Sequence, residues 1–146
     1  MIKQNRWQHI LGVARKCKEY ALTLKNDDKF AEDMFLLGML HDMGYEFMEN
    51  NASHASVGGE ILKRNNYKYW QEVTLHGDEK IDDMSDELFI LNCADMTTGP
   101  GGENFSFDER LEEIASRFGK EADAYKKCVI EVQKLRNDKR YHKLKK

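Results

Sequence analysis

Apolar side chains recur at three- and four-residue steps along most of the chain, which is the period of an amphipathic α-helix. The first segment, residues 2–24, shows this most clearly. Its apolar positions are Trp7, Ile10, Leu11, Ala14, Cys17, Ala21 and Leu24. No segment shows the alternation expected of a half-buried strand. We therefore predict an all-α fold, a bundle of about six to seven helices.

Residues typical of helix N-caps mark where further helices begin. They are Asp27 or Asp28, Asn51 or Ser53, Ser85, and the pair Ser106 and Glu109, which has capping-box spacing. Glycines typical of helix ends follow at Gly44, Gly77 and Gly119. We also expect Met84 to pack on Phe89 as a hydrophobic staple, and a short helix around Tyr69 to His76. A last helix carries the apolar stripe Tyr125, Cys128, Val129, Val132 and Leu135.

The bulk composition fits one reduced globular domain. A chain of 146 residues can bury a sizeable core, so we predict a single domain over residues 1–146. The three cysteines are odd in number and have no paired spacing, which favours the reducing cytoplasm. No apolar run is long enough to span a membrane, and no signal-type segment is apparent.

The charge balance gives no strong case for nucleic acid or membrane as a partner. Charged residues make up 34% of the chain, but the net charge is only -3. The charges are distributed unevenly, because residues 78–87 are acidic and residues 134–146 are basic. Either run fits a solvated surface, and the basic one is a helix end or an interaction tail.

Histidines and aspartates are spaced along the predicted helices in a way that suggests a metal site. They are His9, the adjacent pair His41 and Asp42, His54, His76 and Asp95. Imidazole and carboxylate groups suit first-row transition metals. Singly, His9 or His41 also fits a hydrogen-bonded core histidine. Asp95, however, is an acid near the negative end of its helix and needs a compensating cation.

The six side chains divide naturally between two divalent ions. One ion takes His9, His41, Asp42 and Asp95, and a second shares Asp42 and takes His54 and His76. One or two ions of Fe, Mn, Co, Ni or Zn are possible. A hydroxide bridging such ions can attack a phosphoryl group, so we expect a hydrolase in which Asp42 and His41 are the central catalytic residues.

The same residues resemble the HD domain superfamily of metal-dependent phosphohydrolases. Residues 6–14 are similar to its opening helix, LGMLHDMG (residues 37–44) to its His-Asp signature, and NCADM (residues 92–96) to its closing aspartate. The resemblance covers about Arg6 to Phe118 and implies a helical bundle around a buried site. It also implies that His9, His41, Asp42 and Asp95 are the core ligands, and that His54 and His76 are the extra histidines of two-metal members.

The resemblance narrows the substrate only to a nucleotide or another small phosphate ester. Residues 95–119 resemble a subgroup of small bacterial members without an assigned substrate. The cyclic dinucleotide phosphodiesterases of the superfamily carry a Gly-Tyr-Pro tripeptide and usually a lysine after the His-Asp signature. This chain has Tyr45 at that position and lacks the tripeptide, which makes this branch a poor match. His54 stands where alarmone hydrolases and nucleoside monophosphatases place acids. The arrangement of His54 and His76 is closer to that of the superfamily's dinucleoside tetraphosphate hydrolases.

Three residues are candidates for substrate contacts. Arg6 lies one helical turn before His9, where its planar fork suits a phosphate, although a surface ion pair is equally possible. Thr97 and Thr98 follow the last ligand and are candidates for the mouth of the site, although threonine beside Gly99 and Pro100 also fits an ordinary turn.

Two other functions fit the same ligand set. The first is a non-catalytic nucleotide-binding or regulatory module that contacts a partner through its basic C-terminal segment. The second is di-iron oxygen chemistry, which the resemblance associates with longer chains carrying an additional substrate lysine. A homodimer is possible, and Trp70, Met84 and Met48 are the apolar side chains to inspect for it.

Overall fold

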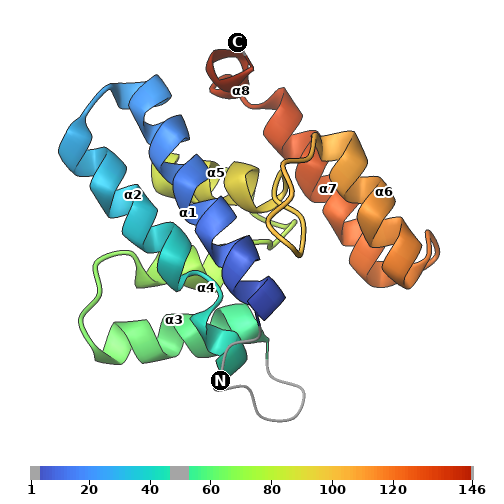
Figure 1. Cartoon of the computed structure of the whole chain (residues 1–146), viewed down its shortest axis with the longest axis horizontal. Coiled ribbons are helices and arrows are strands. Elements are labelled where there is room, and N and C mark those ends of the chain that lie inside the picture. Colours follow the sequence, from blue (N-terminus) through green and yellow to red (C-terminus); the bar gives the residue numbers. More distant parts are fainter. Residues whose placement is uncertain (1–3, 47–52, 146) are drawn as a thin grey trace.

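The computed structural model describes residues 4–46 and 53–145, and these residues form an all-α fold (Figure 1). The helices are α1 (Gln4–Lys25), α2 (Asp28–Leu40), α3 (His54–Arg64), α4 (Trp70–Leu75), α5 (Asp86–Asp95), α6 (Phe107–Phe118), α7 (Asp123–Asn137) and α8 (Tyr141–Leu144), with a 3-10 helix at Met43–Glu46. The described residues contain no strand, only an isolated bridge between Thr98 and Asn104. The predicted fold class is confirmed.

Helices α1 and α2 form an antiparallel pair that packs without space for a side chain at its closest point. Asp27 caps α2 as predicted, because its carboxylate accepts hydrogen bonds from the backbone N–H groups of Lys29 and Phe30. At Gly38, a Cβ atom would lie 2.6 Å from the Cα atom of Ala14. This close approach brings His9 on α1 near the C-terminal end of α2.

Helices α3 and α4 pack beneath the C-terminal end of α2. The contact depends on Gly44, where any Cβ atom would overlap the carbonyl oxygen of His54. The first residue of α3 therefore lies beside the turn that follows α2. Gly44 was predicted to end α2, and this prediction is wrong, since the α-helix ends at Leu40 and Gly44 lies in the 3-10 helix.

Helix α5 runs through the centre of the molecule and is buried on nearly all sides. Every residue from Leu88 to Ala94 is buried. Ser85 caps the helix by accepting a hydrogen bond from the N–H of Leu88, and Met84 and Phe89 belong to one apolar cluster, as predicted for a staple. The burial of α5 places its last residue, Asp95, within the molecule.

Helices α6 and α7 form a hairpin at one end of the molecule (right in Figure 1). Ser106 and Glu109 make both hydrogen bonds of the predicted capping box. Short helix α8, which the apolar pattern did not predict, follows α7 and contacts α1.

Several sequence predictions concern residues that are either buried or outside the described part. Of the apolar side chains to inspect for a dimer, Met84 is buried, with 7% of its surface exposed, and Trp70 is half-buried, so neither presents a fully exposed apolar surface. Ile2, Met48 and Asn51 lie outside the described residues. None of the described helices has the length and apolar character required to cross a bilayer.

Candidate metal centre

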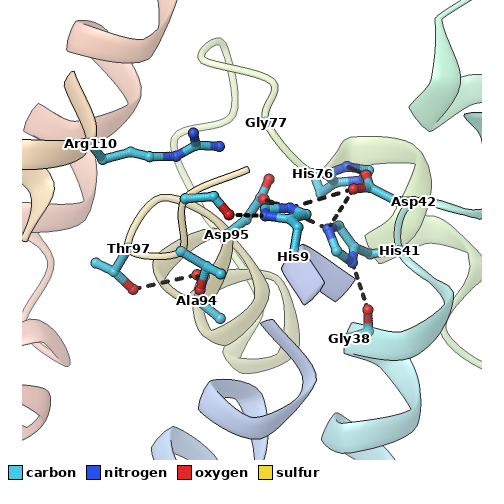
Figure 2. Close-up of polar contacts among 12 residues, drawn as sticks. His9, Gly38, His41, Asp42, His76, Gly77, Ala94, Asp95, Thr97 and Arg110 are labelled. Carbon is cyan, nitrogen blue, oxygen red and sulfur yellow. Dashed lines mark hydrogen bonds and ion pairs between the residues drawn. The ribbon is translucent and has the colours of Figure 1, made fainter. Parts of the chain in front are cut away.

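Six predicted ligands come from five different helices or their ends and meet at one place, and Figure 2 labels five of them, all except His54. Four of them lie where a helix begins or ends, where a side chain can turn inward without the restriction of a helix face. They are His41, at the C-cap of α2, His76, at the C-cap of α4, His54, the first residue of α3, and Asp95, the last residue of α5. His9 is on α1, and Asp42 follows His41.

The first half of the cluster joins two histidines to two carboxylates. Nε2 of His9 lies 3.0 Å from Oδ1 of Asp95 and 3.5 Å from Oδ2 of Asp42. Nε2 of His41 lies 3.3 Å from Oδ2 of Asp42 and 3.6 Å from Oδ1 of Asp95. Potential ligand atoms of His9, His41 and Asp95 all lie within 4.8 Å of one another. This spacing suits donors around one ion.

The second half of the cluster uses the other oxygen of Asp42. Oδ1 of Asp42 lies 3.4 Å from Nε2 of His54 and 3.7 Å from Nε2 of His76. The two Nε2 atoms are 3.2 Å apart. Asp42 thus presents one carboxylate oxygen to each pair of histidines.

Backbone carbonyl groups orient three of the imidazole rings. Nδ1–H of His41 donates to the carbonyl of Gly38 at 2.6 Å, Nδ1–H of His76 donates to Val73 at 2.6 Å, and Nδ1–H of His9 donates to Gly99 at 2.9 Å. With Nδ1 bonded outwards to a carbonyl group, Nε2 of each ring is directed into the cluster. This arrangement is typical of metal-binding histidines, whose outer nitrogen donates to a fixed acceptor.

One buried nitrogen of the cluster makes no hydrogen bond. Nε2 of the fully buried His41 is one of the few buried side-chain polar atoms in the described part of the chain in this state, although carboxylate oxygens of Asp42 and Asp95 lie 3.3 and 3.6 Å away. A buried polar atom without a hydrogen bond costs about 1–3 kcal/mol. A divalent cation would satisfy this atom and neutralise the two carboxylates. The donor set and this orphaned nitrogen therefore fit a metal site.

Charge coupling within the cluster shifts the pKa values of its members. Burial would lower the pKa of His41, but the carboxylates of Asp42 and Asp95 outweigh it and hold that pKa well above its ordinary value. Burial raises the pKa of both aspartates, but the neighbouring histidines outweigh it and lower both. The cluster therefore retains a proton that a divalent cation would displace.

His54 behaves differently because it faces another imidazole. Burial and the adjacent His76 lower the pKa of His54 to about 4. His54 is thus neutral at pH 7, which is the form that binds metals. Its side chain is 30% exposed, so this side of the cluster opens towards solvent.

A cleft of about 640 Å³ adjoins the cluster. Its lining includes His9, Asp42, His54, His76 and Asp95. The lining also contains four basic residues, Lys80, Arg110, Arg117 and Lys127, and the side chain of Phe118. Phe118 is 55% exposed, which leaves an accessible aromatic face beside the cleft.

The three predicted substrate contacts are not among the described residues that line this cleft. Among the described residues, those lining the cleft include neither Arg6, which is half-buried, nor the two threonines. The hydroxyl of Thr98 is fully buried and donates to the carbonyl of Ala94 at 2.7 Å. Thr97 donates to the carbonyl of Cys93 at 2.7 Å and lines a separate hollow.

Sequence reasoning did not identify Arg110 and Glu131, which are buried charged residues in the cleft wall. A weak signal for Arg110 exists, because it lies four residues before the buried Ile114 and so on the apolar face of α6. Glu131 directly precedes the buried Val132. No motif distinguishes either residue from an ordinary surface charge.

Comparison with known families gives a match over most of the chain. A family model described as HD domain matches residues 6–127, which include all six predicted ligands and Arg110. Comparisons with curated proteins and with solved structures give no match.

Proposed function

The chain belongs to the HD domain family, and from that membership we propose that it hydrolyses a nucleotide or another small phosphate ester. The family consists generally of metal-dependent phosphohydrolases, and the buried histidines and aspartates of this chain are suited to hold a divalent metal. In the proposal, all six predicted residues are ligands.

The division of contacts at Asp42 carries the proposal of two ions. Because Oδ2 faces His9 and His41 while Oδ1 faces His54 and His76, one carboxylate can serve both halves of the cluster. Asp95 completes the first half through its contact with His9. Fe, Mn, Co, Ni and Zn all suit this donor set, and their supply decides among them.

Bound divalent ions would supply an activated water near neutral pH and positive charge beside the phosphoryl group. The chain's own residues fix the geometry of that reaction. Asp42 and His41 lie at the centre of the ligand cluster. The carbonyl of Gly38 sets the ring orientation of His41, and the negative charge of Asp95 would balance the positive charge of a bound ion. The cleft lining includes Lys80, Arg110, Arg117 and Lys127, which can face an incoming phosphate, together with the acidic residues Asp78, Glu79 and Glu131.

The cleft supports a nucleotide as the substrate. Its volume of about 640 Å³ lies within the range of small-molecule sites. The exposed ring of Phe118 offers a surface on which a base can stack, while the basic residues suit phosphates. A dinucleoside tetraphosphate is a narrower candidate within this class. The three cysteines are free thiols, which supports a reducing, cytoplasmic location.

The test is hydrolysis by protein stripped of metal and then reloaded separately with Mn²⁺, Fe²⁺, Co²⁺, Ni²⁺ or Zn²⁺. We expect release of phosphate from model esters or from members of a nucleotide panel with at least one ion. The Asp42→Ala variant should lose this activity, and Arg64→Gln, which alters an exposed ion pair on α3, should retain it. Equal rates for wild type and Asp42→Ala with every ion would refute the proposal.

A further inference from the structure

Two ionisable side chains are buried in the wall of the cleft that the metal-ligand cluster also lines. Arg110 on α6 is 9% exposed, and Glu131 on α7 is 4% exposed. Both line the cleft together with Asp95. Figure 2 shows Arg110 extending from its helix towards Asp95. Neither residue is one of the six predicted ligands.

Each of these side chains has a buried polar atom without a hydrogen bond. Within the described part of the chain, the atoms are Nε of Arg110 and Oε2 of Glu131. Nη1 of Arg110 donates to Glu113 at 2.6 Å, which holds the guanidinium in place. Each unpartnered buried atom costs about 1–3 kcal/mol. A polar ligand in the cleft would offset that cost by supplying the missing partners.

The chemistry of the two groups indicates what the ligand is. A planar guanidinium matches the oxygens of a phosphate, and it stays charged at any physiological pH. A carboxyl group assists an anion only when it is protonated and can donate. Burial raises the pKa of Glu131 to about 8, so this carboxyl is protonated at neutral pH.

The charged groups around Glu131 oppose one another. The carboxylate of Asp95 at the end of α5 raises its pKa, Arg110 on α6 lowers it, and Asp78 and Glu79 in the segment before α5 raise it. On α7 itself, Lys127 and Cys128 line the same cleft, and burial keeps Cys128 a neutral thiol by raising its pKa to about 11. The acids thus favour the protonated form of Glu131, which can donate a hydrogen bond.

Resting on the proposed phosphohydrolase function, we infer that Arg110 and Glu131 form a phosphate-binding wall facing the metal centre. The Arg110 guanidinium and the Glu131 carboxyl both donate to non-bridging oxygens of the substrate phosphate. Glu113 is a positioning residue, because it acts through Arg110. This wall would bind the phosphate oxygens of the substrate directly, which the six metal ligands do not do.

The experiment measures binding of inorganic phosphate to the manganese-loaded protein by calorimetry at pH 7. We expect Arg110→Gln to weaken phosphate binding at least about tenfold and Arg110→Lys to weaken it less, because lysine keeps the charge but loses the fork. Arg64→Gln, whose arginine forms an exposed ion pair on α3, is the matched control and should bind as wild type does. Glu131→Leu should weaken binding more than Glu131→Gln, since the amide still donates.

The outcomes separate this inference from the proposed function. If the wild type hydrolyses esters while Arg110→Gln keeps wild-type phosphate affinity and KM, the wall is refuted and the activity stands. If the wild type hydrolyses nothing but phosphate binding depends on Arg110, the activity fails and the wall stands. Should Arg110→Gln not fold, Arg110→Lys and Glu131→Leu carry the same test. Absence of phosphate binding by the loaded wild type overturns the inference.

Discussion

Asp42 lies between two pairs of histidines, and its two carboxylate oxygens divide the contacts between them. A side chain in this position serves both halves of the cluster, so its loss would affect both proposed ion sites. The loss of a peripheral histidine would affect only one. His54 faces Oδ1 of Asp42, and its side chain, which is 30% exposed, is the most exposed of the ligands in these pairs. Substitutions at His54 and Asp42 can therefore show whether the cluster holds one metal ion or two.

We predict that His54→Gln reduces the metal content from two ions per chain to one, whereas Asp42→Ala loses both. Elemental analysis of purified, reloaded protein measures the ratio. His142→Gln is the matched control, because His142 is exposed and does not line the cleft, and it should keep two ions. Two ions in His54→Gln would instead make His54 a substrate contact.

Glu131 gives a pH dependence of known sign. Burial raises its pKa from 4.5 to about 8 in the folded protein. Between these values the unfolded chain has lost the proton and the folded protein keeps it, so wild-type stability should fall as pH rises from about 4.5 to about 8. Below that window and above it, this contribution is constant.

We predict that metal-free Glu131→Gln gains stability relative to the wild type across that window. Each unit of pKa shift corresponds to about 1.4 kcal/mol. The gain in unfolding free energy of Glu131→Gln over the wild type should therefore be larger at pH 8.5 than at pH 5 by more than about 1 kcal/mol. Urea unfolding of both proteins at the two pH values provides the measurement. Parallel stability curves would show that Glu131 ionises normally in the folded state.

At the scale of elements, Gly38 determines how closely α1 and α2 approach. A Cβ atom there would lie 2.6 Å from Ala14 Cα and 2.9 Å from its backbone nitrogen, and neither backbone atom can turn aside. The carbonyl of Gly38 also accepts the hydrogen bond that orients His41. Helix packing and ligand geometry therefore depend on the same residue.

We predict that Gly38→Ala lowers the unfolding free energy by about 1–3 kcal/mol, because overpacking outweighs the gain in helix propensity of about 1 kcal/mol. Metal affinity should fall as well, since the shift of α2 moves His41. Gly101→Ala is the control, because its Cβ would first meet the end of the Glu103 side chain at 3.3 Å. Urea unfolding and metal titration measure the two effects, and wild-type values for both would contradict this account.

The helices and the ligand cluster were predictable because each has a local signal. Apolar spacing and caps such as Asp27 and Ser106 define the helices, and the histidines and aspartates are distinctive residue types. The 3-10 helix at Met43–Glu46 was not predicted, since the glycine there serves tertiary packing and does not end a helix. Arg110 and Glu131 were missed because tertiary packing, which has no local signal in the sequence, buries them.

In the molecule as a whole, the acidic run at residues 78–87 and the basic run at residues 134–146 form ion pairs with each other. Lys134 lies 2.7 Å from Asp82, and Arg140 lies 2.8 Å from Asp86. The basic segment is therefore partly engaged within the chain. These contacts weaken the case for a free interaction tail, because two charges of the basic segment already face Asp82 and Asp86 of the acidic run.

Arg140 anchors the C-terminal end through more than one interaction. It donates to Asp86 and Asp138, and also to the backbone carbonyl of Met84 at 3.1 Å. Its guanidinium lies 4.6 Å from the centre of the Phe89 ring, and its side chain is only 24% exposed. Partial burial and several bonds distinguish this network from an isolated surface pair, whose contribution is close to zero.

We predict that Arg140→Gln lowers the unfolding free energy by about 1–3 kcal/mol, because charged hydrogen bonds are lost and Asp86 and Asp138 are left facing each other. Lys139→Gln, at an exposed neighbouring position, removes the same formal charge and should change stability by less than about 0.5 kcal/mol. Urea unfolding at low and high salt compares them. Equal losses in the two variants would mean that net charge, not the docking of the chain end through Arg140, sets the stability, and the basic segment would then be available to a partner.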